Sequence, residues 1–211
     1  MTATAATRYL YLTRHGEATE DESELTAVGR RQAVLLGKRL RGVPLSAVHH
    51  GPLPRTAQTA RLIGDQLDGV PAHICEAAGD YVPHTPERAE LPADSADHLL
   101  DFVHRFPAAE RERGPLLARQ AVERFTGPVE GTEDRHELVV THNFLIGWLV
   151  REILGAPDWR WLGLNHGNAA LTVLRYPAPG RPASVVFWND MAHLSSELRW
   201  TGLGPELRDM P

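Results

Sequence analysis

The sequence of 211 residues holds a single cysteine, Cys75, and a single lysine, Lys38, among its 22 basic residues. One cysteine cannot form an internal disulfide, so the cysteine content gives no sign of an oxidising compartment. A net charge of −5 argues against the strongly basic surface that non-specific nucleic-acid binding requires. No apolar run has the length of a membrane span, and residues 1–7 do not resemble a secretory signal. We therefore expect a cytoplasmic protein that binds neither nucleic acid nor membrane.

The remaining composition is that of an ordinary globular protein. Hydrophobic residues make up 42% of the chain and charged residues 23%, which is enough apolar surface for one core and too little bias for disorder. The length and the absence of a composition break predict a single domain over residues 1–211. Because lysine is almost missing, nearly every positive charge is an arginine, whose planar fork suits bidentate contacts with oxyanions.

Short apolar runs alternate with helical patterns along the chain. Such alternation predicts an α/β fold with three layers, in which helices cover both faces of a mostly parallel central sheet. Pro107 is expected to break the helical region 95–126, and Gly114-Pro115 is a second candidate break. We expect strands at 8–13, 45–49, 72–75, 137–142, 168–176 and 184–189, helices over roughly 26–42, 52–67, 95–126 and 143–150, and an irregular segment at 76–94.

Unusual residues follow three of the expected strands. Arg14-His15-Gly16 follows the first strand, Arg55 lies just beyond the second, and His142-Asn143 follows the strand at 137–142. In α/β folds, ligands bind beyond the carboxyl ends of strands. If the three junctions converge, two guanidinium groups, two imidazoles and the N–H groups of helix starts surround one small space, which favours a phosphate group. His50, at the end of the second strand, is a candidate for the edge of the same space.

The neighbourhood of these residues resembles the histidine phosphatase superfamily, also called the phosphoglycerate-mutase-like family, across most of the chain. The branch that it resembles most is that of phosphoglycerate-mutase-like Ser/Thr protein phosphatases. Two features depart from the family pattern: the short loop at 17–24 lacks the asparagine that is usual after the Arg-His-Gly triplet, and Gly51 stands where a serine is usual. The matching motifs are Thr13-Arg14-His15-Gly16-Glu17, Leu25-Thr26-x-x-Gly29-x-x-Gln32-Ala33, Pro52-Leu53-x-Arg55-Thr56-x-Gln58-Thr59-Ala60 and Val140-Thr141-His142-Asn143.

The resemblance implies a phosphoglycerate-mutase-like fold and a phosphatase that needs neither metal nor cofactor. It implies that His15 is the nucleophile that becomes a phosphohistidine, and that Arg14, Arg55 and His142 bind and neutralise the phosphoryl group. Glu76 occupies the position of the carboxylic acid that protonates the leaving oxygen. We expect substrate contacts from Arg14, Arg55, His142, Asn143 and Gly16, the last because glycine lets the backbone approach a ligand closely.

Several alternatives remain open on the sequence alone. Asp80, Glu87 and Glu90 are rivals of Glu76 for the acid, because only geometry can choose among loop carboxylates. Cys75 is expected to be a buried residue and not a nucleophile, since a cysteine-phosphatase loop would need an arginine at the position of Tyr81. For function, the alternatives to a phosphatase are a phosphoglycerate-type mutase and a catalytically silent module that binds phosphorylated ligands.

The expected partner is a phosphorylated small molecule or a phosphoprotein. The loops at 17–24 and 76–94 are expected to form the walls of the pocket and to decide which phosphomonoester is accepted. We interpret the five tryptophans as core packing. The hairpin near the C-terminus, which is rich in tryptophan, is a hint of a homodimer.

Overall fold

The computed structural model describes residues 5–204 and shows a six-stranded sheet between two layers of helices. The strand order is β4-β3-β6-β2-β7-β8; the first four strands are mutually parallel, and β7 pairs antiparallel with both of its neighbours, β2 and β8. The expected α/β class with a mostly parallel sheet is confirmed. The strands are β1 Ala5–Ala6, β2 Arg8–Arg14, β3 Leu45–His50, β4 Ala72–Ile74, β5 Val129–Glu130, β6 Arg135–Thr141, β7 Leu171–Tyr176 and β8 Ser184–Asp190; the helices are α1 Ala27–Arg39, α2 Pro54–Gly64, α3 Ala96–His104, α4 Ala108–Phe125 and α5 Asn143–Ile153.

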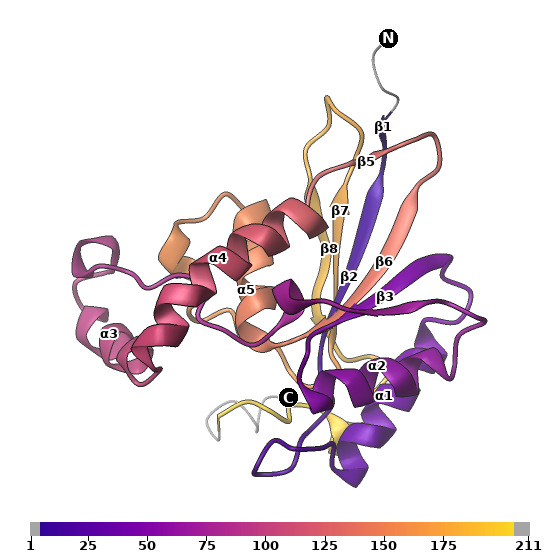
Figure 1. The fold of residues 1–211 in the computed structure, drawn as a ribbon, viewed down its shortest axis with the longest axis horizontal. Coiled ribbons are helices and arrows are strands. Elements are labelled where there is room, and N and C mark those ends of the chain that lie inside the picture. The colour runs from indigo at the N-terminus through magenta and orange to yellow at the C-terminus, as the bar shows by residue number, and fades with distance from the viewer. Residues whose placement is uncertain (1–4, 205–211) are drawn as a thin grey trace.

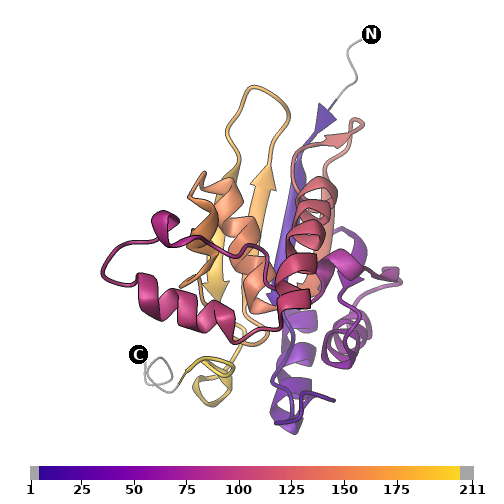
Figure 2. The same cartoon turned by 60° about the vertical axis from the view of Figure 1, so that its left-hand side comes forward.

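The two faces of the sheet bury separate cores. Along β2, Leu10 and Leu12 pack on the face covered by α4 and α5, whereas Tyr11 packs on the face covered by α1 and α2. This alternation follows from the two-residue period of a strand. Helices α1 and α2 lie on one side of the sheet and α4 and α5 on the other, with α3 farther from the sheet than α4 (Figures 1 and 2). Both faces are therefore covered, as a largely parallel sheet requires.

The helix boundaries follow the sequence signals in most places. Thr26 caps α1 by accepting a hydrogen bond from the backbone N–H of Gly29. Pro107 separates α3 from α4, as expected. The expected break at Gly114-Pro115 is absent, because Pro115 lies inside α4. Gly114 allows α4 to pass close to the segment after β4, since a Cβ at this position would lie 1.9 Å from the carbonyl oxygen of Val82.

The sheet register brings the ends of β2, β3 and β6 together. Arg14 pairs with Thr141, and His50 pairs with Val140, so the residues that follow all three strands emerge at one edge of the sheet. No helix within residues 5–204 is both long and apolar enough to cross a bilayer.

Candidate active site

His15 follows the last residue of β2 and lies beside His142, the residue that precedes α5. The backbone N–H of His15 donates to the carbonyl of Thr141 at 3.0 Å, and the two imidazole rings have centroids 5.1 Å apart. Both residues are buried, with 5% of His15 and 2% of His142 accessible to solvent. The convergence of these two strand ends was predicted from the sequence and is present in the structure.

Hydrogen bonds define which nitrogen of His15 faces the pocket. Nδ1 lies 2.7 Å from the carbonyl oxygen of Gly16, which can only accept, so Nδ1 carries the proton. Nε2 is then left with its lone pair, and the Nε of Arg55 donates to it at 3.3 Å. The ring is thereby oriented with an unprotonated nitrogen toward Arg55, which is the arrangement that a nucleophilic imidazole needs.

Burial and positive neighbours keep both imidazoles neutral. Desolvation, with smaller effects from His142 and Arg14, lowers the pKa of His15 well below its usual value of 6.5. Desolvation, followed by Arg55 and Arg14, has the same effect on the pKa of His142. Nδ1 of His142 lies 3.3 Å from the carboxylate of Asp80, whereas Nε2 has no hydrogen-bond partner among the described residues. This buried imidazole therefore presents a polar atom that a ligand in the adjacent pocket can contact.

The two arginines are held in different ways. Arg14 donates from one Nη to the carbonyl oxygens of His166, at 3.1 Å, and Gly202, at 2.6 Å. Arg55, in the first turn of α2, has an Nη 2.8 Å from Asp80 and 3.2 Å from Glu22. Arg14 is thus fixed by neutral carbonyls, while Arg55 already contacts two carboxylates.

Glu22 lies at the tip of the loop between β2 and α1. Its backbone has φ of 57°, a left-handed conformation that is uncommon for glutamate. The turn is held by Asp21, which accepts hydrogen bonds from the hydroxyl of Thr19 at 2.6 Å and the hydroxyl of Ser23 at 2.9 Å. The loop therefore directs the Glu22 carboxylate toward Arg55.

Glu76, which the resemblance assigns as the general acid, is not brought to this site. Its side chain is 62% exposed, lies 3.5 Å from Arg113, and borders a separate surface depression. Asp80, one of its rivals, reaches the site instead, with its carboxylate 3.3 Å from Nδ1 of His142. The other two rivals, Glu87 and Glu90, flank a 3-10 turn and cap each other's backbone.

Gly51 helps to determine that the carboxylate of Asp80, and not that of Glu76, lies at the site. A Cβ at Gly51 would lie 2.5 Å from the carbonyl oxygen of Ala78, and the hydroxyl of Thr141 donates to the same oxygen at 2.7 Å. Because of these contacts, the segment after Glu76 packs against the ends of β3 and β6, and Asp80 lies next to His142. The replacement of the family's usual serine by Gly51 is therefore explained by a close backbone approach.

Asp80 has the environment of a proton donor. Its side chain is 37% accessible through the pocket, and desolvation raises the pKa of the carboxyl, although Arg55 and Arg14 oppose this effect. A carboxylic acid with a raised pKa holds its proton closer to neutral pH, which general acid catalysis requires.

Gly16 has a structural role that was not expected. Its N–H donates to the hydroxyl of Thr59 at 3.0 Å, and a Cβ at Gly16 would lie 2.5 Å from the carbonyl oxygen of Gly29. Gly16 borders neither of the two pockets described below and instead allows the loop to pack on α1.

The other two candidates for the edge of the site have different outcomes. His50 does not line either pocket; its Nδ1 contacts the carbonyl of Gly51 at 2.8 Å. Asn143 does line the pocket, and its side-chain oxygen accepts from the N–H of His166 at 2.6 Å.

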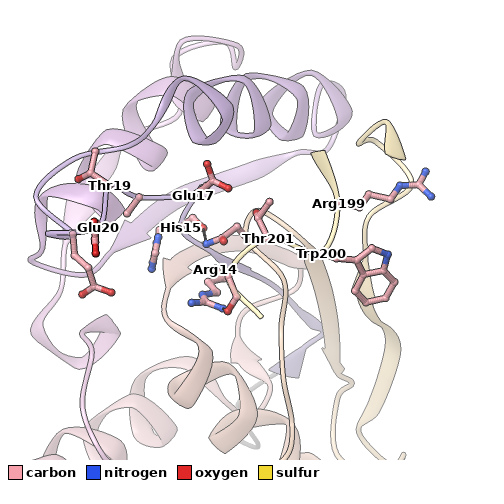
Figure 3. Close-up of a pocket in the computed structure, with 12 residues that line it drawn as sticks. Arg14, His15, Glu17, Thr19, Glu20, Arg199, Trp200 and Thr201 are labelled. Atoms are coloured by element: carbon pink, nitrogen blue, oxygen red, sulfur yellow. Dashed lines mark hydrogen bonds between the residues drawn. The ribbon is translucent and has the colours of Figure 1, made fainter. Parts of the chain in front are cut away.

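Two open pockets meet at Arg14, His15 and Glu22. The first, of about 480 Å³, lies between the loop after β2 and residues 199–202. In Figure 3, Thr19 and Glu20 lie on one side of His15 and Arg14, and Arg199 and Trp200 lie on the opposite side. The second pocket, of about 500 Å³, is lined by Arg14, His15, Glu22, Leu53, Arg55, Asp80, Phe106, Glu110, His142, Asn143 and Phe144.

The walls of the pockets agree only partly with expectation. The loop at 17–24 lines the first pocket as expected. The segment at 76–94 contributes only Asp80 to the second pocket, whose other wall comes from Phe106, Glu110 and Phe144. Trp200 borders the first pocket, although it was interpreted as a core residue. Asn168, whose amide donates to the carbonyl of His15 at 2.9 Å, also borders the first pocket and was not singled out from the sequence.

The comparison with protein families agrees with this geometry. The model of the histidine phosphatase superfamily, branch 1, matches residues 10–191. The chain belongs to the histidine phosphatase superfamily. The matched region contains every residue of the second pocket.

Individual relatives of this superfamily member carry different names. The chain is 28% identical over 194 residues to the mitochondrial Ser/Thr-protein phosphatase Pgam5 of Caenorhabditis briggsae, and covers 65% of that protein's length with 90% of its own. It is 24% identical to the probable phosphoglycerate mutase GpmB of Salmonella paratyphi A, covering 89% of this chain and 95% of the relative. Bacillus stearothermophilus YhfR has the same fold, with a TM-score of 0.62, 24% identity, and coverage of 88% of this chain and 98% of that one.

The buried histidines make the stability of this fold sensitive to mild acid. Burial lowers the pKa of His166 to about 3, and burial, followed by Arg39, lowers the pKa of His193 to about 4. The folded state resists protonation, while the unfolded chain binds protons below about pH 6.5. The stabilising effect is therefore present above pH 6.5 and lost as the pH falls. For His166 alone, the free energy of unfolding should fall by about 1.4 kcal/mol per pH unit.

Urea unfolding at pH 7 and pH 5 would measure this effect. The raised pKa values of Asp80 and Glu110 act in the opposite direction and reduce the total slope. His166→Gln should therefore have a shallower dependence than the wild type. A wild-type free energy of unfolding that stays constant, or that increases toward pH 5, would contradict the prediction.

Proposed function

We propose that this protein is a phosphatase that hydrolyses phosphomonoesters through a phosphohistidine on Nε2 of His15. The observation that carries the proposal is the orientation of His15, whose Nδ1 proton is held by Gly16 while Nε2 faces Arg55 in the pocket. The lone pair of Nε2 is the electron pair that forms the N–P bond. Arg14 and Arg55 balance the negative charge of the phosphoryl group, and the neutral imidazole of His142 contacts it.

The first step transfers the phosphoryl group to the enzyme. Nε2 attacks phosphorus, the P–O ester bond breaks, and the leaving oxygen takes a proton from Asp80. The hydrogen bond from Nδ1 to the carbonyl of Gly16 stabilises the positive charge that the ring acquires. In the second step water attacks phosphorus, Asp80 accepts a proton from that water, and the N–P bond breaks to release phosphate and neutral His15.

Hydrolysis is favoured over the mutase reaction by the charges of the pocket. A phosphoglycerate mutase has to bind the substrate's carboxylate as well as its phosphate. Among the described residues that line the second pocket, the cations are Arg14 and Arg55, both of which the phosphate group uses. The remaining charged groups there are carboxylates, which repel a sugar acid. Both pockets also open to solvent at His15, so water can reach the phosphohistidine.

We propose that the natural substrate is a phosphorylated small molecule or a phosphoprotein. The relatives named as Ser/Thr-protein phosphatases support the second kind, and the openness of the two pockets on either side of His15 would admit an extended chain.

Phosphate release from 4-nitrophenyl phosphate in the presence of EDTA tests the proposal. Turnover that survives EDTA and produces an acid-labile, alkali-stable phosphoenzyme supports metal-independent phosphohistidine chemistry. Conversion of 3-phosphoglycerate to 2-phosphoglycerate with little release of phosphate would favour the mutase. Tight binding of phosphomonoesters without turnover would favour a module that only binds.

A further inference from the structure

The second pocket contains more acidic groups than hydrolysis requires. Its charged lining residues, among those the structure describes, are two arginines and the three carboxylates of Glu22, Asp80 and Glu110. The arginines face the phosphoryl position, and Asp80 is assigned to proton transfer. Glu110 has no role in either task, and so its presence in the wall needs another explanation.

Glu110 is fixed in the first turn of α4, next to the site of the leaving group. The backbone N–H of Val82 and the carboxyl of Asp80 both lie near enough to interact with its carboxyl. No ion pair of Glu110 occurs within residues 5–204. Desolvation, followed by Asp80, raises the pKa of Glu110. A partly buried carboxylate without a cation is unfavourable, and a positive charge on a ligand would remove this penalty.

Aromatic rings stand beside Glu110 in the same wall. Phe106 and Phe144 are packed edge to face with centroids 5.5 Å apart, and both line the pocket. The face of a phenylalanine ring attracts ammonium and guanidinium groups within about 6 Å. A carboxylate next to aromatic rings is therefore a suitable site for a cation, whereas an anionic group would be repelled there.

The same pocket shows independently that it receives a ligand. His142 is 98% buried; its Nδ1 lies 3.3 Å from the Asp80 carboxylate, but its Nε2 has no hydrogen-bond partner among the described residues. A buried polar atom without a partner is costly, so the Nε2 nitrogen is best explained by a contact with bound substrate. The position of the phosphoryl group beside His142 and His15 places the ester oxygen and its alcohol on the side of Asp80 and Glu110.

We propose that the Glu110 wall makes the enzyme selective for phosphomonoesters whose alcohol carries a positive charge close to the ester oxygen. The proposal rests on the phosphatase function given above and defines its substrate class. The cation is an ammonium group of an amino-alcohol phosphate or a basic side chain beside a phosphoserine. Either source places a positive group between Glu110 and the rings, while the phosphoryl group binds the arginines.

Matched substrates test the proposal in the wild-type protein. We expect kcat/KM for phosphoethanolamine and phosphocholine to exceed that for glycerol 2-phosphate, whose alcohol is neutral, by about tenfold or more. A phosphoserine peptide with flanking arginines is compared with the same peptide with flanking aspartates. If the enzyme prefers the amino-alcohol phosphates over glycerol 2-phosphate but does not distinguish the two peptides, the substrate is a small molecule. If it distinguishes only the peptides, the substrate is a phosphopeptide.

Glu110→Gln tests the residue itself. Glutamine keeps an oxygen that can accept the Val82 N–H and removes only the charge. We expect the ratio of kcat/KM for the preferred cationic substrate over its neutral or acidic partner to fall about tenfold. Glu112→Gln is the matched control, because Glu112 is exposed on the same helix and borders neither pocket. The preference should also weaken with added salt.

The outcomes separate failure of this inference from failure of the phosphatase proposal. Hydrolysis of 4-nitrophenyl phosphate without a preference for cationic alcohols overturns the inference and leaves the phosphatase intact. An unchanged ratio in folded Glu110→Gln also overturns it. If no ester is hydrolysed, the affinities of phosphocholine and glycerol 2-phosphate for the wild type are compared by calorimetry. Tighter binding of phosphocholine supports the inference, and equal affinities contradict it. Thermal unfolding of each variant shows whether the fold is kept.

Discussion

Replacing His15 with alanine is expected to reduce kcat for phosphomonoester hydrolysis by about 10⁴-fold or more, because the N–P bond can no longer form. Loss of the nucleophile has an effect of this size in serine proteases. His15 is buried, so the variant leaves a cavity beside Arg55 in which free imidazole can bind. We therefore expect partial recovery of turnover when imidazole is added. The measurements are kcat with an aryl phosphate and detection of the labelled phosphoenzyme.

His50→Ala is the matched control for this substitution. His50 also lies at the end of a parallel strand, and its Nδ1 also contacts the carbonyl of the following glycine, yet it does not line either pocket. Its replacement should remove a similar imidazole and leave kcat close to the wild-type value. Turnover that persists in His15→Ala without imidazole, or a phosphoenzyme that still forms, would refute the assigned nucleophile.

Replacing Asp80 with asparagine is expected to reduce kcat on alkyl phosphates by about 10² to 10⁴-fold, the usual contribution of a general acid. An alkoxide is a poor leaving group and needs the proton, whereas 4-nitrophenolate leaves without it. The loss should therefore be much smaller on 4-nitrophenyl phosphate. Asp80 also pairs with Arg55, and asparagine keeps an oxygen near the same Nη. A steady-state comparison of the two substrates measures the difference.

Glu76→Gln is the counterpart, because the resemblance to the family points to Glu76 while the geometry points to Asp80. Glu76 is exposed and pairs with Arg113 outside the pocket. Its substitution should leave kcat within about twofold of the wild type on both substrates. If Glu76→Gln lost activity on the alkyl ester and Asp80→Asn kept it, the assignment of the acid would have to be reversed.

The sequence predicts the sheet and the core of the site well, since both depend on local signals. Strand ends are marked by Arg14-His15-Gly16 and Thr141-His142-Asn143, and parallel strands necessarily place such ends at one edge. His15, His142, Arg14 and Arg55 therefore come together as expected. Thr26, an N-cap, and Pro107, a helix break, likewise act within a few residues of their position in the chain.

The rest of the site depends on contacts between distant segments. Whether Glu76 or Asp80 faces His142 depends on Gly51 and Thr141, which hold the carbonyl of Ala78. No pattern within the segment at 76–94 contains this information. Pro115 is likewise accommodated within α4 without the expected break.

Glu22 gives Arg55 a counter-ion that is attached to the protein. A carboxylate on a short, hydrogen-bonded turn has an effective concentration in the millimolar range or above at the arginine. Binding of a phosphate ester is therefore an exchange of one anion for another, and its net affinity is lower than that of an empty arginine pair. The same exchange assists the end of the cycle, because the carboxylate can return to Arg55 as phosphate departs. For the proposed phosphatase, competition from Glu22 therefore weakens the binding of the phosphate product and makes its release faster.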